Sequence, residues 1–387
     1  WYYEGTQNLG RLPIEVDEER TNSNPKNWRN ERGKPCVMPE GHDFRKIEGD
    51  CKKGHMVLLH SHCIHGSDAN NSNRMRRNFL TSYLKTDYYF CPKALKVKNY
   101  FSSNFKLGVL GGGQLGKMLL TETHKFDIYT SILDGDKNAP CAQICNEFHQ
   151  GSLMDYGTVY NFGKKVDLLT IEIEHVNIEA LLKLEEEGLE IYPQPNVLKI
   201  IQHKGTQKDF FVKNNIPTSL HKRFSSLEDL KKETLKFPFV WKSAQFGYDG
   251  TGVKIVKNEN ELNSLANTDC IVEELVPFKN ELAVIVARNK NGEIKTYPVV
   301  EMEFHPEANQ VEYVICPARI SNEVAEKAKS IALKVAKSFK HIGLLAVEMF
   351  QTVNDEILVN EVAPRTHNSG HYSIEASFTS QFEQHVR

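Results

Sequence analysis

Polar side chains crowd residues 361–385, which read EVAPRTHNSGHYSIEASFTSQFEQH. A glutamate, an arginine, histidines, an asparagine and several serines follow the apolar run 357–362. Polar residues of so many kinds are too dense for a packed core. An active-site rim has this composition, because a strand there delivers acids, donors and cations to one point. The segment therefore predicts a reactive site at the exit of a strand.

A β-hairpin is predicted just before this segment. Two apolar stretches, residues 344–350 and 357–363, flank Asn354-Asp355, which is typical of a two-residue turn. Such a turn pairs Val353 with Glu356 and fixes every other pair of the two strands.

Counting back from this turn places Glu348 directly opposite Glu361. Directly opposed side chains share a face of the sheet, with Cβ atoms about 5 Å apart. Two carboxylates so placed repel each other unless a cation or a proton lies between them. A hard dication such as Mg²⁺ satisfies both. Glu348 and Glu361 are therefore predicted metal ligands, and Asn360 is a secondary one.

A glycine-rich segment opens the α/β part of the chain, where residues 107–116 read LGVLGGGQLG. A strand, a glycine turn and a helix N-terminus form an anion site, because backbone N–H groups and the helix dipole converge there. The glycines also fit G-x-G-x-x-G, and Asp134 stands where a dinucleotide fold places its ribose acid. Taken alone, this motif favours NAD, but the chain downstream is not a second mononucleotide-binding half.

A second glycine-rich segment, FGYDGTG at 246–252, follows a short strand, FVWK, at 239–242. Three glycines in seven residues allow a backbone to lie over phosphates, and Lys242 supplies a charge beneath them. A plain glycine hairpin is the alternative, and the preceding lysine favours a phosphate lid.

These motifs, in this order over residues 105–387, resemble the N5-carboxyaminoimidazole ribonucleotide synthase family, which are ATP-grasp ligases of purine biosynthesis. The resemblance implies an α/β chain with a Rossmann-like pre-ATP-grasp domain at 105–196 and an ATP-grasp domain at 197–387. It implies that ATP and bicarbonate give carboxyphosphate, which carboxylates the amine of 5-aminoimidazole ribonucleotide. Mg²⁺, a cytoplasmic location and a homodimer are further implications.

The same resemblance implies roles for single residues. The implied nucleotide contacts are Lys204, Lys242, Gly247, Gly250, Gly252, Glu273, Val276 and Glu281, with the adenine hinge at Glu273 and Val276 and the ribose at Glu281. The implied catalytic residues are Tyr248, Asp249, Arg365 and His367. The implied ribonucleotide contacts are Gly113, Gln114, Leu115, Glu174, Asn368 and Ser369. Two alternatives stay open: Lys204 as a surface lysine and Glu174 as a solvated strand-end acid.

The catalytic assignments have physical reasons. A planar guanidinium such as that of Arg365 holds bicarbonate or carboxyphosphate well. His367 suits the same anion or the movement of a proton. Asp249 is placed by the resemblance near the reacting phosphate.

Residues 1–88 form a different piece, joined by a linker at 89–104. It is polar and turn-rich, with short strand-like runs, which indicates a β-rich fragment. HSHCIHGSDANNSNRMRRN, at 60–78, resembles the C-terminal motif of the phytanoyl-CoA dioxygenase family, which uses Fe²⁺ and 2-oxoglutarate. The resemblance implies a partial jelly roll with His65 as an iron ligand and Arg76 as the 2-oxoglutarate clamp.

The oxygenase site is incomplete in this sequence. No His-x-Asp occurs in residues 1–86, and a facial triad needs two histidines and a carboxylate. The alternatives to the ligase are therefore an oxygenase remnant, or a fusion of two fragments with no combined activity.

Composition limits the partners of the chain. Its 387 residues carry a net charge of −2, whereas a nucleic-acid binder usually has a basic excess. No apolar run approaches the roughly 20 residues that span a bilayer. Eight scattered cysteines indicate free thiols in a cytoplasmic protein.

The chain begins at Trp1, and both ends are interpreted as cuts. The family continues into a small C-terminal domain with further basic residues, which nothing here matches.

Overall fold

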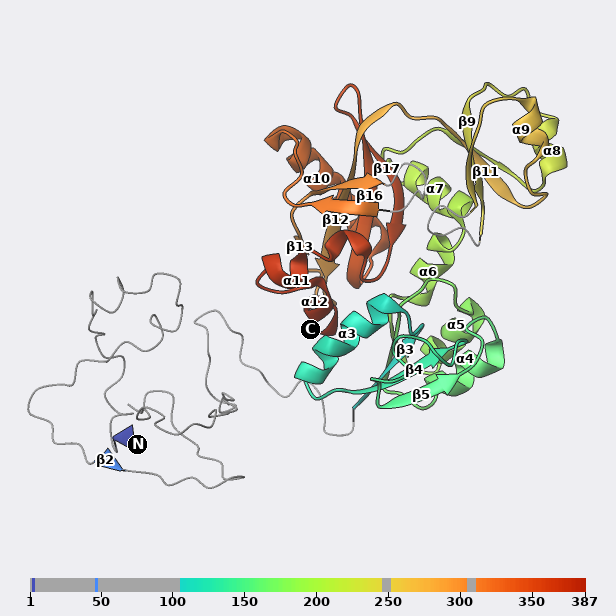
Figure 1. The fold of residues 1–387 in the computed structure, drawn as a ribbon. Coiled ribbons are helices and arrows are strands. Elements are labelled where there is room, and N and C mark those ends of the chain that lie inside the picture. The colour runs from blue at the N-terminus through green and yellow to red at the C-terminus, as the bar shows by residue number, and fades with distance from the viewer. Residues whose placement is uncertain (1, 4–45, 48–104, 246–251, 305–310) are drawn as a thin grey trace, which may run out of the picture. The chain divides into compact units, whose positions relative to one another are not determined.

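The computed structural model describes residues 2–3, 46–47, 105–245, 252–304 and 311–387 (Figure 1). The chain divides into two compact units, residues 1–96 and 97–387, and each is described by itself. In the first unit, β1 (Tyr2–Tyr3) pairs antiparallel with β2 (Lys46–Ile47). The partial jelly roll, with His65 and Arg76, lies outside the described residues.

The second unit begins with a five-stranded parallel sheet in the order β5-β4-β3-β6-β7. Its strands are β3 (Lys106–Leu110), β4 (Tyr129–Asp134), β5 (Glu147–Gln150), β6 (Leu168–Ile171) and β7 (Glu190–Tyr192). Its helices are α3 (Gln114–Lys125), α4 (Tyr156–Gly163) and α5 (Ile178–Glu186). The strand order reverses between β3 and β6, and open α/β sheets bind ligands at the carboxyl ends of such strands. The predicted α/β class is confirmed.

Two short helices lead out of this sheet (Figure 1). They are α6 (Pro195–Ile201) and α7 (Lys204–Lys213). The chain breaks between them because His203 is the N-cap of α7, and its Nδ1 accepts a hydrogen bond from the Thr206 N–H at 3.2 Å. Lys204 is thereby placed on the first turn of α7.

A small antiparallel sheet follows, in the order β10-β9-β11-β8. Its elements are β8 (His221–Phe224), α8 (Leu227–Lys231), β9 (Phe239–Ser243), β10 (Val253–Val256), α9 (Glu259–Asn263) and β11 (Cys270–Glu274). We call this region the first lobe. Phe239, Trp241 and Leu230 are buried in its own core.

A second antiparallel sheet has the order β15-β14-β12-β16-β17, with β13 on β12. Its strands are β12 (Phe278–Arg288), β13 (Ile294–Thr296), β14 (Val300–Phe304), β15 (Val311–Ile315), β16 (Gly343–Thr352) and β17 (Ile357–Ala363). We call this region the second lobe. Its helices are α10 (Asn322–Phe339), η2 (Asn368–Gly370), α11 (Ser373–Ala376) and α12 (Gln381–Val386).

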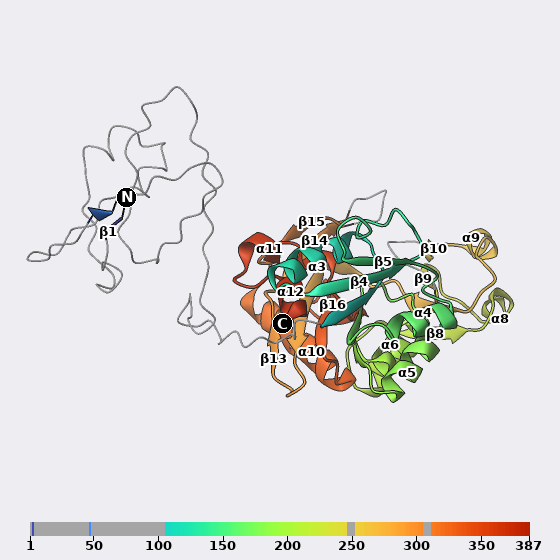
Figure 2. The same ribbon diagram turned by 90° about the horizontal axis from the view of Figure 1, so that it is seen from below.

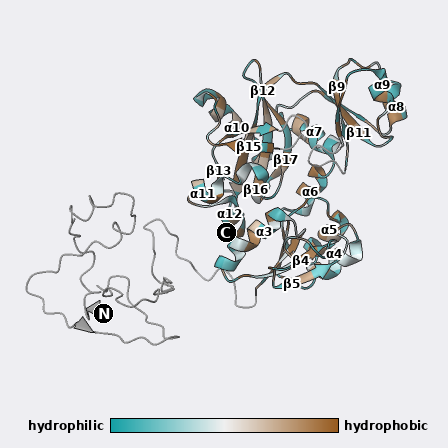
Figure 3. Cartoon of the chain, in the orientation of Figure 1, coloured by the Kyte–Doolittle hydropathy of each residue, from teal (hydrophilic) through white to brown (hydrophobic). Residues whose placement is uncertain are grey.

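Helix α10 covers one face of the second lobe. Val324, Ala328, Ile331 and Val335 recur at intervals of three or four residues, so they form one buried stripe. This stripe packs on strands β12 and β16 in the hydrophobic core of the second lobe. Figure 3 shows hydrophilic and hydrophobic residues along the same helix. Within the described ranges, no helix is both long and apolar enough to cross a membrane.

The end of the chain returns to the first sheet. Helix α12 lies beside α3 in both ribbon views (Figures 1 and 2). Phe382 of α12 is 1% exposed and packs with Leu119 and Leu120 of α3. Nε2 of His385 lies 2.9 Å from Oγ1 of Thr170 on β6. The second lobe is thus fixed to the parallel sheet through this last helix.

We predict that protonation of His341 lowers the stability of the chain as the pH falls. This side chain is 1% exposed, its Nε2 lies 2.7 Å from the Leu344 carbonyl oxygen, and burial lowers its pKa to about 4. An unfolded histidine has a pKa of about 6.5, so the unfolded state binds an extra proton between these values. The contribution is therefore complete above about pH 6.5 and is lost as the pH falls toward 4, by at most about 3 kcal/mol.

Urea unfolding of wild type and His341→Gln at pH 7 and pH 4.5 tests this prediction. Glutamine keeps a donor for Leu344 and does not titrate, so the variant should lose less stability on acidification. The exposed His124→Gln is the matched control and should behave as wild type. An equal loss of stability in all three proteins would contradict the account.

Candidate active site

The hairpin of β16 and β17 places Glu348 opposite Glu361, as predicted. The predicted turn is wrong. The Thr352 N–H donates to the Glu356 carbonyl at 2.9 Å, so the loop has three residues, and its last, Asp355, has a φ of 61°. Three-residue hairpin loops commonly end on such a left-handed residue. The register is therefore shifted by one residue beside the loop.

A β-bulge corrects that shift. Val359 pairs with Met349 and Glu361 pairs with Glu348, so Asn360 has no partner across the strands. Two consecutive side chains of β17 consequently contact lysines, one from the first lobe and one from α7. Nζ of Lys242 donates to Oδ1 of Asn360 at 2.9 Å, and a second lysine reaches Glu361. Bulges often re-aim side chains next to active sites.

That second lysine is Lys204, whose Nζ donates to Oε2 of Glu361 at 2.7 Å. The Lys204 side chain is 18% exposed, so the open alternative of a surface lysine does not describe its position. Burial acts to lower the pKa of Lys204, but the carboxylates of Glu361, Glu273 and Glu348 together outweigh it and raise that pKa. Lys204 in turn holds the pKa of Glu361 well below its usual range. A lysine of α7 therefore meets a carboxylate of β17.

Behind Lys242 lies a buried group of three charges. The Glu273 carboxylate, with a side chain 3% exposed, has Oε1 3.1 Å from Nζ of Lys242 and Oε2 3.3 Å from Nζ of Lys208. Oγ of Ser219 donates to Oε2 of Glu273 at 2.8 Å. Burial acts against the charged carboxylate, yet the two lysines lower its pKa to about 2.

His367 is held on three sides. Its Nε2 lies 3.0 Å from Oε1 of Glu348, and its Nδ1 lies 2.9 Å from Oγ of Ser369. Both backbone groups of His367 bond to the side chain of Gln381, which is fully buried. Ser369 is also fully buried, whereas Asn368 is exposed. Ser369 therefore orients His367 in this structure.

Arg365, which follows β17 of the second lobe, forms an ion pair with Glu174, which follows β6 of the parallel sheet. Nε of Arg365 lies 2.9 Å from Oε1 of Glu174, with 17% and 19% of the side chains exposed. The loop after β6 that carries Glu174 is fixed by Gln202, whose Nε2 donates to the carbonyls of Glu174 and Val176 at 2.6 and 2.8 Å. Glu174 is therefore a paired acid in this structure.

The glycine loop after β3 wraps around carboxylates of the chain itself. The Gly112 N–H donates to Oδ2 of Asp134 at 2.7 Å, and Oε1 of Glu172 lies 3.4 Å from the Gly116 nitrogen. A Cβ on Gly113 would lie 2.5 Å from Oε1 of Glu172. These carboxylates occupy the loop, so an anion bound there would have to displace them. Gln114 is exposed and Leu115 is half-buried at the start of α3.

Two other predicted nucleotide contacts, Gly252 and Val276, lie just before β10 and just after β11. Gly252 has a φ of 80°, and its carbonyl accepts a hydrogen bond from the Ser243 N–H at 2.9 Å. Val276 is buried between β11 and β12. Four predicted lid residues lie outside the described residues: Gly247, Tyr248, Asp249 and Gly250.

The donor set at the hairpin suits a hard dication. Glu348, Glu361 and Asn360 offer carboxylate and amide oxygens, which are the ligands that Mg²⁺ prefers. Burial, Glu348 and Glu361 together raise the pKa of the nearby Glu281 to about 7, which indicates an excess of negative charge at this place. Within the described residues, no three His, Cys, Asp or Glu side chains form a cluster that would hold a metal by protein ligands alone. Phosphate oxygens would have to complete the coordination.

Family models match both parts of the second unit. Residues 105–202 match a ribonucleotide synthetase preATP-grasp domain, and residues 209–382 match an ATP-grasp domain. The parallel sheet with its following helices and the two lobes correspond to these matches in order.

Relatives cover the same part of the chain. It is 41% identical over 293 residues to phosphoribosylaminoimidazole carboxylase of Candida albicans, covering 73% of this chain and 51% of that protein. It is 36% identical over 288 residues to N5-carboxyaminoimidazole ribonucleotide synthase of Bacillus subtilis, covering 73% and 75%. The chain belongs to the N5-carboxyaminoimidazole ribonucleotide synthase family of ATP-grasp proteins. It spans about half the length of the Candida albicans relative.

A solved member of this family has the same fold. The N5-carboxyaminoimidazole synthase of Aspergillus clavatus, in complex with ADP and 5-aminoimidazole ribonucleotide, is 35% identical, with a TM-score of 0.67. The match covers 74% of this chain and 77% of that chain. The arrangement of a preATP-grasp domain followed by an ATP-grasp domain is therefore established.

Sequence reasoning missed four residues that shape this ATP-grasp site: Glu172, Gln202, Lys208 and Gln381. Lys208 had a detectable signal, because it lies four residues after Lys204 on the same face of α7. Like charges at this spacing destabilise a helix unless acids face them. The other three act through contacts between segments distant in the sequence, and no local pattern marks them.

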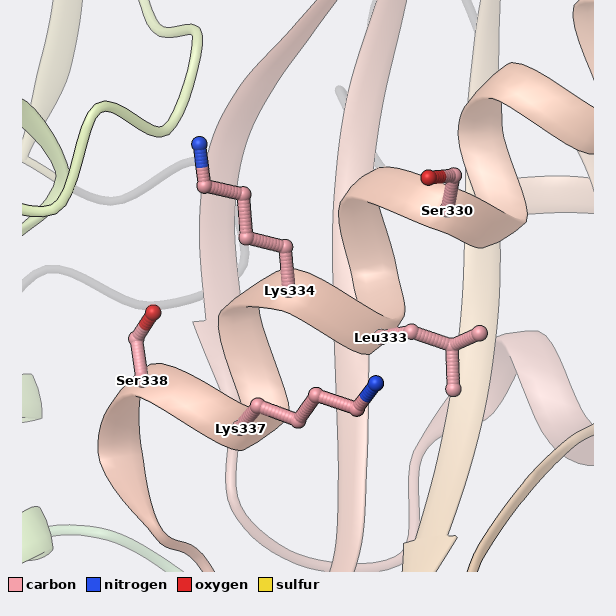
Figure 4. Close-up of a pocket in the computed structure, with 5 residues that line it drawn as sticks. All are labelled: Ser330, Leu333, Lys334, Lys337 and Ser338. Carbon is pink, nitrogen blue, oxygen red and sulfur yellow. The ribbon is translucent and has the colours of Figure 1, made fainter.

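Two surface pockets contain none of the residues to which the sequence assigns a ligand. Ser330, Leu333, Lys334, Lys337 and Ser338 of α10 line one of them (Figure 4). Nζ of Lys334 donates to the Asn215 carbonyl at 2.5 Å, so one lysine of this pocket is already engaged. The other pocket lies between α7 and the start of β8. Neither contains a residue predicted from the sequence to contact a ligand.

We predict that Glu174→Gln destabilises the chain, because it leaves Arg365 without its carboxylate between the two sheets. A hydrogen bond to a charged group is worth about 1.5–3 kcal/mol, so the free energy of unfolding should fall by about 1–3 kcal/mol. Urea unfolding at pH 7 measures it. Glu179→Gln, whose side chain is 72% exposed and 3.6 Å from Lys199, is the control and should change stability by less than about 0.5 kcal/mol. Equal effects of the two variants would contradict a structural role for the Glu174–Arg365 pair.

Proposed function

We propose that residues 105–387 catalyse the ATP- and bicarbonate-dependent carboxylation of 5-aminoimidazole ribonucleotide to N5-carboxyaminoimidazole ribonucleotide. The γ-phosphoryl group of ATP passes to bicarbonate and gives ADP and carboxyphosphate. The exocyclic amine of the ribonucleotide then forms a bond to the carboxyl carbon, the bond from that carbon to the phosphate oxygen breaks, and the amine loses a proton. The pathway is de novo purine biosynthesis.

One observation carries this proposal. Glu348, Asn360 and Glu361 of the second lobe face Lys204 and Lys242, which come from α7 and the first lobe. Oxygen ligands on one side and ammonium groups on the other suit a polyphosphate with a hard dication. Support also comes from the ADP and ribonucleotide complex of the Aspergillus clavatus relative.

The residues divide into groups with different tasks. Lys204 and Lys242 would bind the phosphates, the segment 246–252 would cover them, and Glu273, Val276 and Glu281 would line the nucleoside. Mg²⁺, held by Glu348, Glu361 and Asn360, would neutralise charge on the transferred phosphoryl group. Catalysis in this reaction class consists mainly of positioning and electrostatic stabilisation.

The acid–base and ribonucleotide groups lie at the exit of β17. We assign Arg365 to bicarbonate or carboxyphosphate and His367 to the same anion or to the amine proton. The ribonucleotide would lie between Asn368-Ser369 and the loops at 113–115 and 174. In this account Arg365 and His367 exchange Glu174 and Glu348 for substrate groups, with Tyr248 and Asp249 closing from the lid.

Domain limits and assembly are also proposals. We divide the ligase part into a preATP-grasp domain at 105–196 and an ATP-grasp domain at 197–387, preceded by a linker at 89–104. A homodimer, a cytoplasmic location and an absence of nucleic-acid partners remain predictions. The oxygenase remnant at 1–88 would require Fe²⁺ and 2-oxoglutarate, and no observation on the described residues favours it.

ADP release by the full 387-residue chain tests the proposed reaction. With Mg²⁺, ATP and bicarbonate, we expect ADP release that depends on added 5-aminoimidazole ribonucleotide. Release that ignores the ribonucleotide would contradict the substrate assignment. An absence of release with retained nucleotide binding would contradict the proposal that this chain turns over by itself.

We further predict that Glu361→Ala abolishes the gain in nucleotide affinity that Mg²⁺ provides. The alanine variant loses one of the two opposed carboxylates, so the dication is no longer bridged between protein and phosphates. Titration calorimetry with ADP, with and without Mg²⁺, measures the gain for each protein. Glu356→Ala, an exposed acid at the end of the same hairpin, is the control and should keep it. An unchanged gain in Glu361→Ala would refute the metal assignment.

A further inference from the structure

Lys208 is a buried lysine to which the proposed function assigns no ligand. It is 2% exposed and lies on α7, one turn after Lys204. Its Nζ donates to Oγ1 of Thr218 and to Oγ of Ser219, each at 2.8 Å, and lies 3.3 Å from Oε2 of Glu273. These three partners account for the three donors of an ammonium group. The side chain is therefore fixed in place and has no donor left for a ligand.

The partners of Lys208 lead directly to the phosphate side of the site. Glu273 contacts Lys208 through Oε2 and Lys242 through Oε1. Thr218 donates to the Val359 carbonyl at 2.7 Å, next to Asn360, which Lys242 also contacts. Lys208 thus connects the first lobe, α7 and β17 at the point where Lys242 is held.

The net charge of Lys208, Lys242 and Glu273 determines how strongly this group attracts an anion. Lys242 and Glu273 alone would form a neutral pair, and the carboxylate would compete with an incoming phosphate for the ammonium group. With Lys208 ionised, the three buried groups carry a net charge of +1. A buried carboxylate between two lysines is neutralised by both of them, and a net positive charge attracts an anion more strongly where water is excluded.

We propose that Lys208 is a positioning residue that neutralises Glu273 and leaves the charge of Lys242 available to the nucleotide phosphates. The proposal rests on the nucleotide site of the proposed function. It differs from a purely structural role because its effect must grow with the number of phosphates on the ligand.

Titration calorimetry of the full chain with adenosine, ADP and ATP tests the proposal. Lys208→Met keeps the length of the side chain and removes its charge. We expect ADP affinity to fall by about tenfold and ATP affinity by more, with adenosine affinity unchanged. Lys222→Met, on β8 in an exposed pair with Glu233, is the control and should leave all three affinities unchanged. Equal weakening of the three ligands by Lys208→Met, or no weakening, would overturn the proposal.

The double variant Lys208→Met/Glu273→Gln supplies the sharper test. It removes one charge of each sign, restores the net charge of +1 at Lys242, and leaves no buried carboxylate without its second lysine. Because Glu273 is also assigned to the nucleoside, ADP affinity is compared as a ratio to adenosine affinity, and we expect this ratio to return close to that of wild type. A ratio as low as in the single variant would overturn the proposal. If Lys208→Met fails to fold, a double-variant ratio well below that of wild type still overturns the proposal; the double variant should fold, because unpaired buried charges destabilise far more than their joint removal.

A pH series gives an independent readout. Burial lowers the pKa of Lys208 to about 8; Glu273 on β11 and Glu361 on β17 act to raise it, and Lys242 on β9 acts to lower it. Lys208 therefore loses its charge as the pH rises through about 8. Wild-type ADP affinity should fall there, and Lys208→Met should lack this step. The same step in both proteins would overturn the proposal. Wild type that binds no ADP at any pH would overturn the nucleotide site itself.

Discussion

The repulsion between closely spaced carboxylates is the constraint on which the rest of this site depends. Glu348 and Glu361 are directly opposed on one hairpin, and burial together with these two carboxylates raises the pKa of the nearby Glu281 to about 7. Such a group is stable in a folded chain only if cations surround it. Each cation comes from a different part of the second unit, so electrostatic compensation and tertiary structure specify each other.

The compensation follows one pattern throughout the site. Glu361 meets Lys204, Glu348 meets His367, and Glu174 meets Arg365. In each of these pairs, both residues are ones to which we assign a ligand. Ligand binding would then consist of exchanging partners, with phosphates and a dication replacing the internal pairs. An arrangement of this kind keeps the site charged and ordered without requiring bare buried ions.

Much of this architecture was readable from the sequence. Apolar stretches and glycine motifs correctly placed the hairpin strands, the strand ending near Lys242 and the strand–loop–helix after residue 105. The opposition of Glu348 and Glu361 was also predicted, although by a route with two compensating errors. The loop contains one residue more than the predicted turn, and the bulge at Asn360 restores the register. A bulge depends on what each face must contact, so local pattern does not reveal it.

The remaining features arise from pairings distant in the sequence. Lys208 and Glu273 are 65 positions apart, and Glu172 reaches the glycine loop from a different strand. Gln381 holds His367 from the far side of η2 and α11. The resemblance assigns Asn368 and Ser369, which Gly370 follows, to the ribonucleotide. This glycine has a packing reason, because a Cβ on Gly370 would lie 2.4 Å from Cδ1 of Ile285.

The central claim is that the opposed carboxylates of the hairpin hold a dication against nucleotide phosphates. Anomalous diffraction from crystals of the full chain grown with ADP and Mn²⁺ tests it most directly. The account predicts a Mn²⁺ peak within coordination distance of both Glu348 and Glu361, with Lys204 moved from Glu361 to a phosphate. A peak at any other place, with the Lys204–Glu361 pair intact beside bound ADP, would contradict it.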